Sequence, residues 1–239
     1  MNHRNNEKDA ILFSGGGRFD IEAVKQLIQD SQTSGPYRKA VYIGAANGDR
    51  EAAFESARDV LIYAGLEEVV FLKLAGEDVD TSKVEEMLKA ADVIFISGGE
   101  VEDGMKWLTK HNLCEYIRQM YFAGKQFLCV SAGTIMMGRY WVNMDEQGEG
   151  RNPYLFDCLN LIPEVFDTHA EEEDWRELKT ALRLMGKNSV GYGIPTLGLI
   201  TADSSGRLTG YNTRLLQFRY NGDGSYTVSA KRGIQQTNG

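Results

Sequence analysis

Short, mainly apolar runs alternate with helix-forming segments through the first half of the chain. Five such runs lie at residues 10–13, 40–43, 69–72, 92–96 and 126–130. Between them, apolar residues recur at intervals of three and four, a spacing that predicts helices packed by one face. Apolar strands separated by such helices are typical of a parallel sheet covered on both faces. We therefore expect an α/β fold, with a doubly wound, mostly parallel sheet in a three-layer sandwich.

The last third of the chain has a different pattern. Residues 193–230 form short alternating runs, separated by turn signals at 203–206 and 221–224. This pattern predicts antiparallel strands or hairpins, which we expect at the edge of the main sheet. No repeat or linker divides the 239 residues, so we expect one domain spanning 1–239.

The composition limits the partners of the chain. A net charge of −8 argues against nucleic acid, which needs a basic face. No apolar run approaches the ~20 residues of a membrane helix, and the N-terminus lacks the apolar core of a secretory signal. Three cysteines at wide spacing, Cys114, Cys129 and Cys158, indicate reduced thiols and neither a disulfide framework nor a zinc site. We expect a cytoplasmic monomer or homodimer without metal or cofactor.

The most informative motif for chemistry surrounds Ser131. The apolar run 126–130 ends at this serine, and Ala132 and Gly133 then open a helix-forming segment. A serine on a tight strand-to-helix turn is a nucleophile elbow, which needs small neighbours and lifts the side chain clear of the sheet. The N–H of Ala132 then points to the same region as the serine hydroxyl, which suits acyl transfer.

Two glycines follow the run 92–96, at Gly98 and Gly99. Glycines after a buried strand let the backbone approach a ligand and present an N–H group. Together with the N–H of Ala132, this pair would form a two-donor oxyanion hole. The alternative is an ordinary turn at the end of a strand.

His169 is the best candidate for a general base among three histidines, because His111 lies in a polar stretch and His3 is near the terminus. Thr168 and Glu171 have the spacing of a capping box, which predicts that a helix begins here with His169 in its first turn. The positive end of that helix would favour a neutral imidazole, whereas the nearby acidic side chains would favour the protonated ring.

These motifs together resemble the peptidase E and cyanophycinase family of serine peptidases. The matching segments follow the order 15–17, 95–99, 131–133, 167–169 and 193–196. The resemblance implies a fold related to class I glutamine amidotransferases. It also implies Ser131 as the nucleophile, His169 as its base, and oxyanion donors at Gly99 and Ala132. Known activities of the family include cleaving dipeptides with an N-terminal aspartate and degrading the aspartate–arginine polymer cyanophycin.

The acid that would complete a triad is less clearly indicated. Many family members carry a glutamate where Thr196 stands, so that source is absent here. The peptidase E version implies an acid in the loop after the elbow helix, which favours Glu146, with Asp145 one place away. Asp167, two residues before His169, is a further candidate and could instead line the substrate site.

The leading hypothesis is a serine peptidase that hydrolyses short peptides with a Ser-His-acid triad. A preference for N-terminal aspartate would require a nearby cation, for which Arg139 is the candidate. The alternative is a non-catalytic relative that binds a small acidic or peptide ligand in the same cleft. A third hypothesis, an amidotransferase-like enzyme, needs a cysteine where Ser131 stands.

Overall fold

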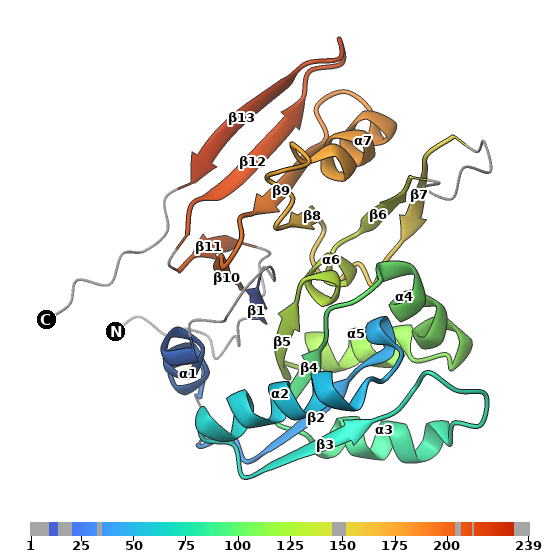
Figure 1. Cartoon of the computed structure of the whole chain (residues 1–239), viewed down its shortest axis with the longest axis vertical. Coiled ribbons are helices and arrows are strands. Elements are labelled where there is room, and N and C mark those ends of the chain that lie inside the picture. Colours follow the sequence, from blue (N-terminus) through green and yellow to red (C-terminus); the bar gives the residue numbers. More distant parts are fainter. Residues whose placement is uncertain are drawn as a thin grey trace, which may run out of the picture.

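A seven-stranded sheet forms the centre of the fold (Figure 1). The computed structural model describes residues 10–13, 21–32, 35–144, 152–203, 207–211 and 213–231. The strand order is β11-β10-β1-β5-β4-β2-β3. The last five strands run parallel to one another, β10 pairs antiparallel with β1, and β11 pairs antiparallel with β10. The strands are β1 (Ala10–Phe13), β2 (Lys39–Ile43), β3 (Glu68–Leu72), β4 (Val93–Ile96), β5 (Gln126–Val130), β10 (Leu199–Ala202) and β11 (Leu208–Gly210).

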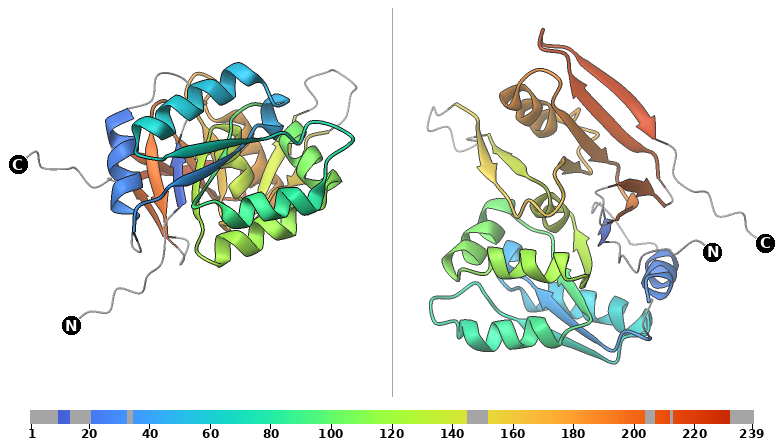
Figure 2. Two further views of the ribbon diagram at one scale, coloured as in Figure 1. Left: turned by 90° about the horizontal axis from the view of Figure 1, so that it is seen from below. Right: turned by 180° about the vertical axis from the view of Figure 1, so that it is seen from behind.

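Helices cover both faces of this sheet (Figures 1 and 2). Alternate residues of β4 enter opposite cores: Ile94 and Ile96 pack with helices α3 to α6, while Val93 and Phe95 pack with α1 and α2. A strand buried on both sides must be apolar at every position. The predicted doubly wound arrangement is therefore confirmed. These helices are α1 (Ile21–Asp30), α2 (Glu51–Tyr63), α3 (Thr81–Ala90), α4 (Val101–Lys110), α5 (Cys114–Phe122) and α6 (Ala132–Met137).

A second sheet, of four strands, lies beyond the carboxyl end of β5 (Figure 1). Its order is β13-β12-β9-β8, and helix α7 (Arg176–Met185) packs on it. The prediction of edge hairpins is right for β10 and β11 but wrong for β12 and β13, which belong to this sheet. Leu178 and Leu182 of α7 bury against Val165 and Phe218, so these strands have a core of their own. The strands are β8 (Val165–Thr168), β9 (Val190–Ile194), β12 (Leu215–Tyr220) and β13 (Tyr226–Lys231).

The candidate site lies where these two parts meet. Strand β5 leads into α6 at Ser131, and β8 ends directly before His169. A two-stranded ribbon of β6 (Tyr140–Asn143) and β7 (Tyr154–Asp157) stands beside them. In the described part of the chain, no helix has both the length and the apolar character needed to span a bilayer.

Candidate active site

Ser131 occupies a strained turn between β5 and α6. Its φ of 50° and ψ of −117° are rare for a residue with a side chain, and such strain tends to occur at functional sites. The turn also needs a small residue at Gly133, because a Cβ added there would lie 2.3 Å from the carbonyl oxygen of Ile96. The chain therefore makes the sharp strand-to-helix turn at Ser131 that the sequence predicts.

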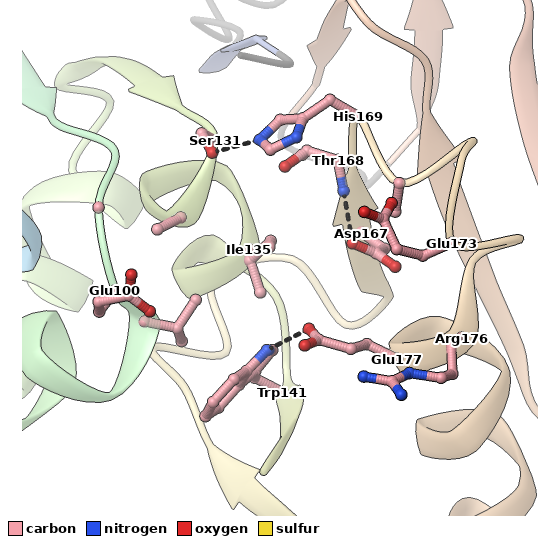
Figure 3. A pocket seen from close by; sticks show the side chains of 14 residues that line it. Glu100, Ser131, Ile135, Trp141, Asp167, Thr168, His169, Glu173, Arg176 and Glu177 are labelled. Carbon is pink, nitrogen blue, oxygen red and sulfur yellow. Dashed lines mark hydrogen bonds between the residues drawn. The ribbon is translucent and has the colours of Figure 1, made fainter. Parts of the chain in front are cut away.

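The His169 ring lies against the Ser131 hydroxyl. The distance from Ser131 Oγ to His169 Nε2 is 2.8 Å (Figure 3), within reach for proton transfer between them. In the neutral tautomer with its proton on Nδ1, Nε2 accepts the serine hydrogen. The backbone of His169 has a φ of 44°, and its N–H donates to the carbonyl of Ile194 at 2.9 Å.

The predicted helix at Thr168 is wrong, because α7 begins only at Arg176. Glu171 forms no capping box and instead accepts hydrogen bonds from the backbone N–H of Thr196, at 2.6 Å, and from its hydroxyl, at 3.2 Å. A partner 25 residues away in sequence therefore replaces the local one. This contact ties the loop after β8, which carries His169, to the loop after β9.

Two backbone N–H groups are available beside Ser131. Gly99 and Ala132 both line the pocket at the serine, and their N–H groups donate to no other residue of the described ranges. Gly98 also lies close, since a Cβ added there would be 3.1 Å from Ser131 Cβ. Gly99 has a φ of 141°, which only glycine adopts without strain. The chain thus brings the predicted oxyanion donors together with the serine.

A pocket of about 290 Å³ opens beside Ser131 and His169. Trp141 forms part of its wall, and its indole N–H donates to Glu177 at 2.8 Å (Figure 3). The charged residues that line the pocket are Glu100, Asp167, Glu173, Arg176 and Glu177. Carboxylates outnumber the one guanidinium in this lining, so the pocket favours a group that carries positive charge.

Asp167 is the buried member of this lining, with 5% of its surface exposed. Its two oxygens accept from the backbone N–H groups of Thr168, at 2.8 Å, and Leu178, at 3.4 Å. Burial, followed by the negative charge of Glu177, raises the pKa of Asp167 to about 7. Its carboxyl group is directed to the backbone, and the structure gives it no hydrogen bond to the His169 ring.

The other predicted residues lie elsewhere. Arg139 is exposed, with its guanidinium 4.8 Å from the centre of the Tyr140 ring, and it does not line the pocket. Asp145 and Glu146 lie outside the described residues. Cys129 is fully buried in β5, and burial raises the pKa of its thiol far above the usual range, so this thiol is not a nucleophile.

Sequence reasoning missed the cation of the pocket. Arg176 enters the lining from the first turn of α7, and no motif distinguished it from other basic residues. Trp141 and Glu177 were also missed. The two residues are 36 positions apart in sequence, on β6 and α7, and only the packing of these two elements brings them to one wall.

A parallel sheet between helices, with a strained serine after one strand and an imidazole on its hydroxyl, is the arrangement of α/β serine hydrolases. Within that class, residues 10–201 match the model of Peptidase family S51. The chain therefore belongs to this family.

Individual relatives agree with this assignment. The chain is 29% identical over 170 residues to a cyanophycinase from Nostoc sp., a match that covers 68% of this chain and 57% of that protein. It is 32% identical over 84 residues to peptidase E from Pasteurella multocida, covering 35% of this chain and 36% of the relative. In fold alone, the chain is also similar to the crystal structure of a peptidase from an acI-B1 actinobacterium, with a TM-score of 0.66 and 17% identity over 96% of both chains.

Proposed function

We propose that this protein is a serine peptidase that hydrolyses short peptides. The observation that carries the proposal is the 2.8 Å contact between Ser131 Oγ and His169 Nε2 on the strained turn. Membership of Peptidase family S51 supports serine peptidase activity in general. We also propose that the fold is of the class I glutamine amidotransferase-like type.

In the proposed reaction, Ser131 Oγ attacks the carbonyl carbon of the scissile bond while His169 Nε2 accepts the hydroxyl proton. The N–H groups of Gly99 and Ala132 stabilise the negative oxygen that forms. His169 then gives its proton to the departing amine, which leaves an acyl ester on Ser131. Water, activated by the same imidazole, hydrolyses this ester and restores the serine.

The proposed acid of the triad is Glu146, with Asp145 as the neighbouring candidate. Their support is the resemblance to the peptidase E version of the motif. In addition, no carboxylate within the described ranges accepts a hydrogen bond from the His169 ring. The test is to measure kcat of Glu146→Gln and of Asp145→Asn side by side. The variant with the larger loss of kcat identifies the residue that orients the imidazole.

The charge of the pocket supports substrates with a free α-amino group. Glu100, Glu173 and Glu177 line the same pocket as Ser131, where carboxylates would hold an ammonium ion. Arg176 is the cation of the same lining and could bind the side chain of an N-terminal aspartate. We therefore propose that the substrates include dipeptides, and that Arg176 takes the role first given to Arg139.

The first test is the reaction of the purified protein with a fluorophosphonate and with dipeptides, using Ser131→Ala as the comparison. We expect stoichiometric labelling of Ser131 and a loss of hydrolysis by at least ~10³-fold in the variant. Unchanged hydrolysis by Ser131→Ala would refute the mechanism. Absence of both labelling and hydrolysis in the wild type would favour the non-catalytic ligand-binding alternative.

The second test compares free and N-acetylated forms of the same dipeptide, and Asp-Leu with Ala-Leu. We expect acetylation to raise KM, because it removes the ammonium ion that the carboxylates bind. Arg176→Gln should lower kcat/KM for Asp-Leu more than kcat/KM for Ala-Leu. Equal hydrolysis of the free and acetylated dipeptides would contradict the proposed role of the acidic lining.

A further inference from the structure

A short turn packs directly on the backbone of Gly98 and Gly99. Its centre is the 3-10 helix η1 (Ala45–Asn47), which follows β2. The N–H of Glu100 donates to the carbonyl of Ala46 at 2.7 Å. A Cβ added at Gly99 would lie only 2.1 Å from the same carbonyl oxygen, so the turn and the glycine pair are in tight contact.

The side chain of Asn47 holds the carbonyl group between these glycines. Asn47 Nδ2 lies 3.2 Å from Gly98 O and 2.7 Å from Ser97 Oγ. Ser97 Oγ itself donates to Gly98 O at 3.2 Å, and it accepts from the buried Tyr42 hydroxyl at 2.8 Å. Two donors therefore converge on one carbonyl oxygen.

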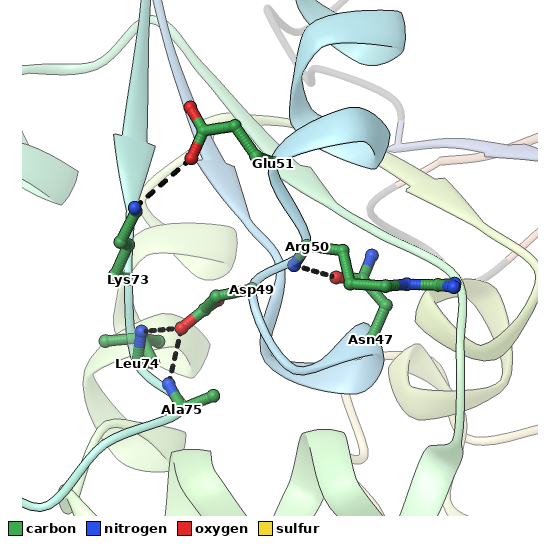
Figure 4. A network of polar contacts seen from close by, with 7 residues as sticks. All are labelled: Asn47, Asp49, Arg50, Glu51, Lys73, Leu74 and Ala75. Atoms are coloured by element: carbon green, nitrogen blue, oxygen red, sulfur yellow. Dashed lines mark hydrogen bonds and ion pairs between the residues drawn. The ribbon is translucent and has the colours of Figure 1, made fainter.

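The orientation of the Asn47 amide is set by its other end. Asn47 Oδ1 accepts from the backbone N–H of Arg50 at 3.1 Å (Figure 4), so the amine end must face Gly98. The turn itself is anchored by Asp49, whose Oδ2 accepts from the N–H groups of Leu74, at 2.6 Å, and Ala75, at 2.5 Å (Figure 4). These contacts keep Asn47 in a fixed place.

Holding Gly98 O also fixes the N–H of Gly99. The two groups belong to one planar peptide unit, and in a trans peptide they point in opposite directions. The described chain contains no cis peptide bond. Since Asn47 and Ser97 hold the carbonyl on one side, the N–H of Gly99 is turned away from them. Gly99 lines the pocket, whereas Asn47 and Ser97 do not.

We propose that Asn47 is a positioning residue that aims the Gly99 N–H at the oxygen formed during peptide hydrolysis. Asn47 is not part of the pocket lining, so it acts through the peptide and not on the substrate. The inference rests on the proposed function, because it assigns Asn47 to the oxyanion hole of that reaction. An oxyanion donor contributes mainly to the transition state.

The test is Asn47→Asp. This change keeps the size of the side chain and the acceptor for Arg50, but it replaces the amide NH2 group with an oxygen that repels the Gly98 carbonyl. The matched control is Asn221→Asp. This half-buried asparagine lies in the turn between β12 and β13 and also donates through Nδ2 to a hydroxyl, Ser225 Oγ, at 2.9 Å. Thermal unfolding of both variants reports on the fold.

We expect Asn47→Asp to lower kcat by ~10 to 100-fold with KM changed less than about twofold, since a misdirected donor costs less than or about as much as a deleted one. Affinity for a peptide boronic acid of the same sequence, which forms a tetrahedral adduct with the serine, should fall by a similar factor. Ser97→Ala should also lower kcat with little change in KM, by a smaller factor than Asn47→Asp. It serves as the test variant if Asn47→Asp does not fold.

The outcomes separate this inference from the proposed function. If the wild type hydrolyses peptides and Asn47→Asp behaves like Asn221→Asp in kcat and boronic acid affinity, the positioning role of Asn47 is refuted while the peptidase remains. If KM rises while kcat and boronic acid affinity stay constant, the role is refuted as well. If the wild type neither hydrolyses peptides nor reacts with a fluorophosphonate, the proposed function fails, and this inference fails with it.

Discussion

Replacing Asp167 with asparagine is expected to stabilise the protein above neutral pH. The carboxyl group is 5% exposed and lies among the acidic residues of the pocket. Burial and the negative charges of Glu177 and Glu173 raise its pKa from 3.8 to about 7, against the opposing hydrogen bonds from two backbone N–H groups. Ionisation of Asp167 is therefore less favourable in the folded chain than in the unfolded one.

The sign and size of the effect follow from linkage. Because the folded pKa is raised, the folded state holds the proton more tightly, and the associated stability is fully present below the unfolded pKa and lost as pH rises through about 7. A pKa difference of about 3 corresponds to ~4 kcal/mol once both states are ionised. Most of this change, ~2.5 kcal/mol, falls between about pH 5 and pH 8.

The measurement is the free energy of unfolding in urea for wild type and Asp167→Asn at several values of pH. We expect the difference, variant minus wild type, to become more favourable to the variant by ~2.5 kcal/mol from about pH 5 to pH 8. A difference that stays constant over this range, or moves the other way, would refute the reasoning. Asp78→Asn, at an exposed aspartate between β3 and α3, is the control and should show no comparable change.

Two further substitutions test contacts that hold the site. Gly99→Ala introduces a Cβ 2.1 Å from Ala46 O and should lower the free energy of unfolding by more than ~3 kcal/mol, measured in urea. Gly124→Ala has a positive φ but no atom within 4 Å of the added Cβ, so it should cost only ~1 kcal/mol; equal losses would contradict the close contact. Glu171→Ala and Thr196→Ala, alone and combined, should show a coupling energy of ~0.5 kcal/mol in a double-mutant cycle, because alanine at 196 removes the hydroxyl donor and keeps the backbone N–H. Strict additivity would exclude the hydrogen bond from the Thr196 hydroxyl.

The order of helices and strands in the first half of the chain can be predicted from sequence, because the apolar pattern of each element reflects which of its faces are buried. The residues of β4 are apolar at every position, and those of β5 are apolar after Gln126, since both faces of the sheet are covered. The strained turn at Ser131 is similarly local, because it requires a residue as small as Gly133 two positions after the serine. With few histidines in the chain, His169 could be selected as the partner of Ser131 by elimination.

Long-range contacts explain where sequence reasoning failed. The spacing of Thr168 and Glu171 matches a capping box, which predicts the start of a helix. Glu171 instead binds Thr196, a partner that lies outside the window of any local pattern. Arg139 was selected for its nearness to the elbow in sequence, whereas Arg176 reaches the pocket from α7. In both cases the outcome depended on how separate elements pack.

The sequence by itself therefore determined the parallel sheet, its two helical layers and the serine on its strained turn, because hydrophobic periodicity and steric limits act within a few residues. The tertiary structure alone decided the charge of the pocket, the raised pKa of Asp167 and the contact of Asn47 with Gly98, a residue 51 positions away. Charge interactions, burial and hydrogen bonds between distant segments exist only once β4, β8 and the turn after β2 have been brought to the same edge of the fold.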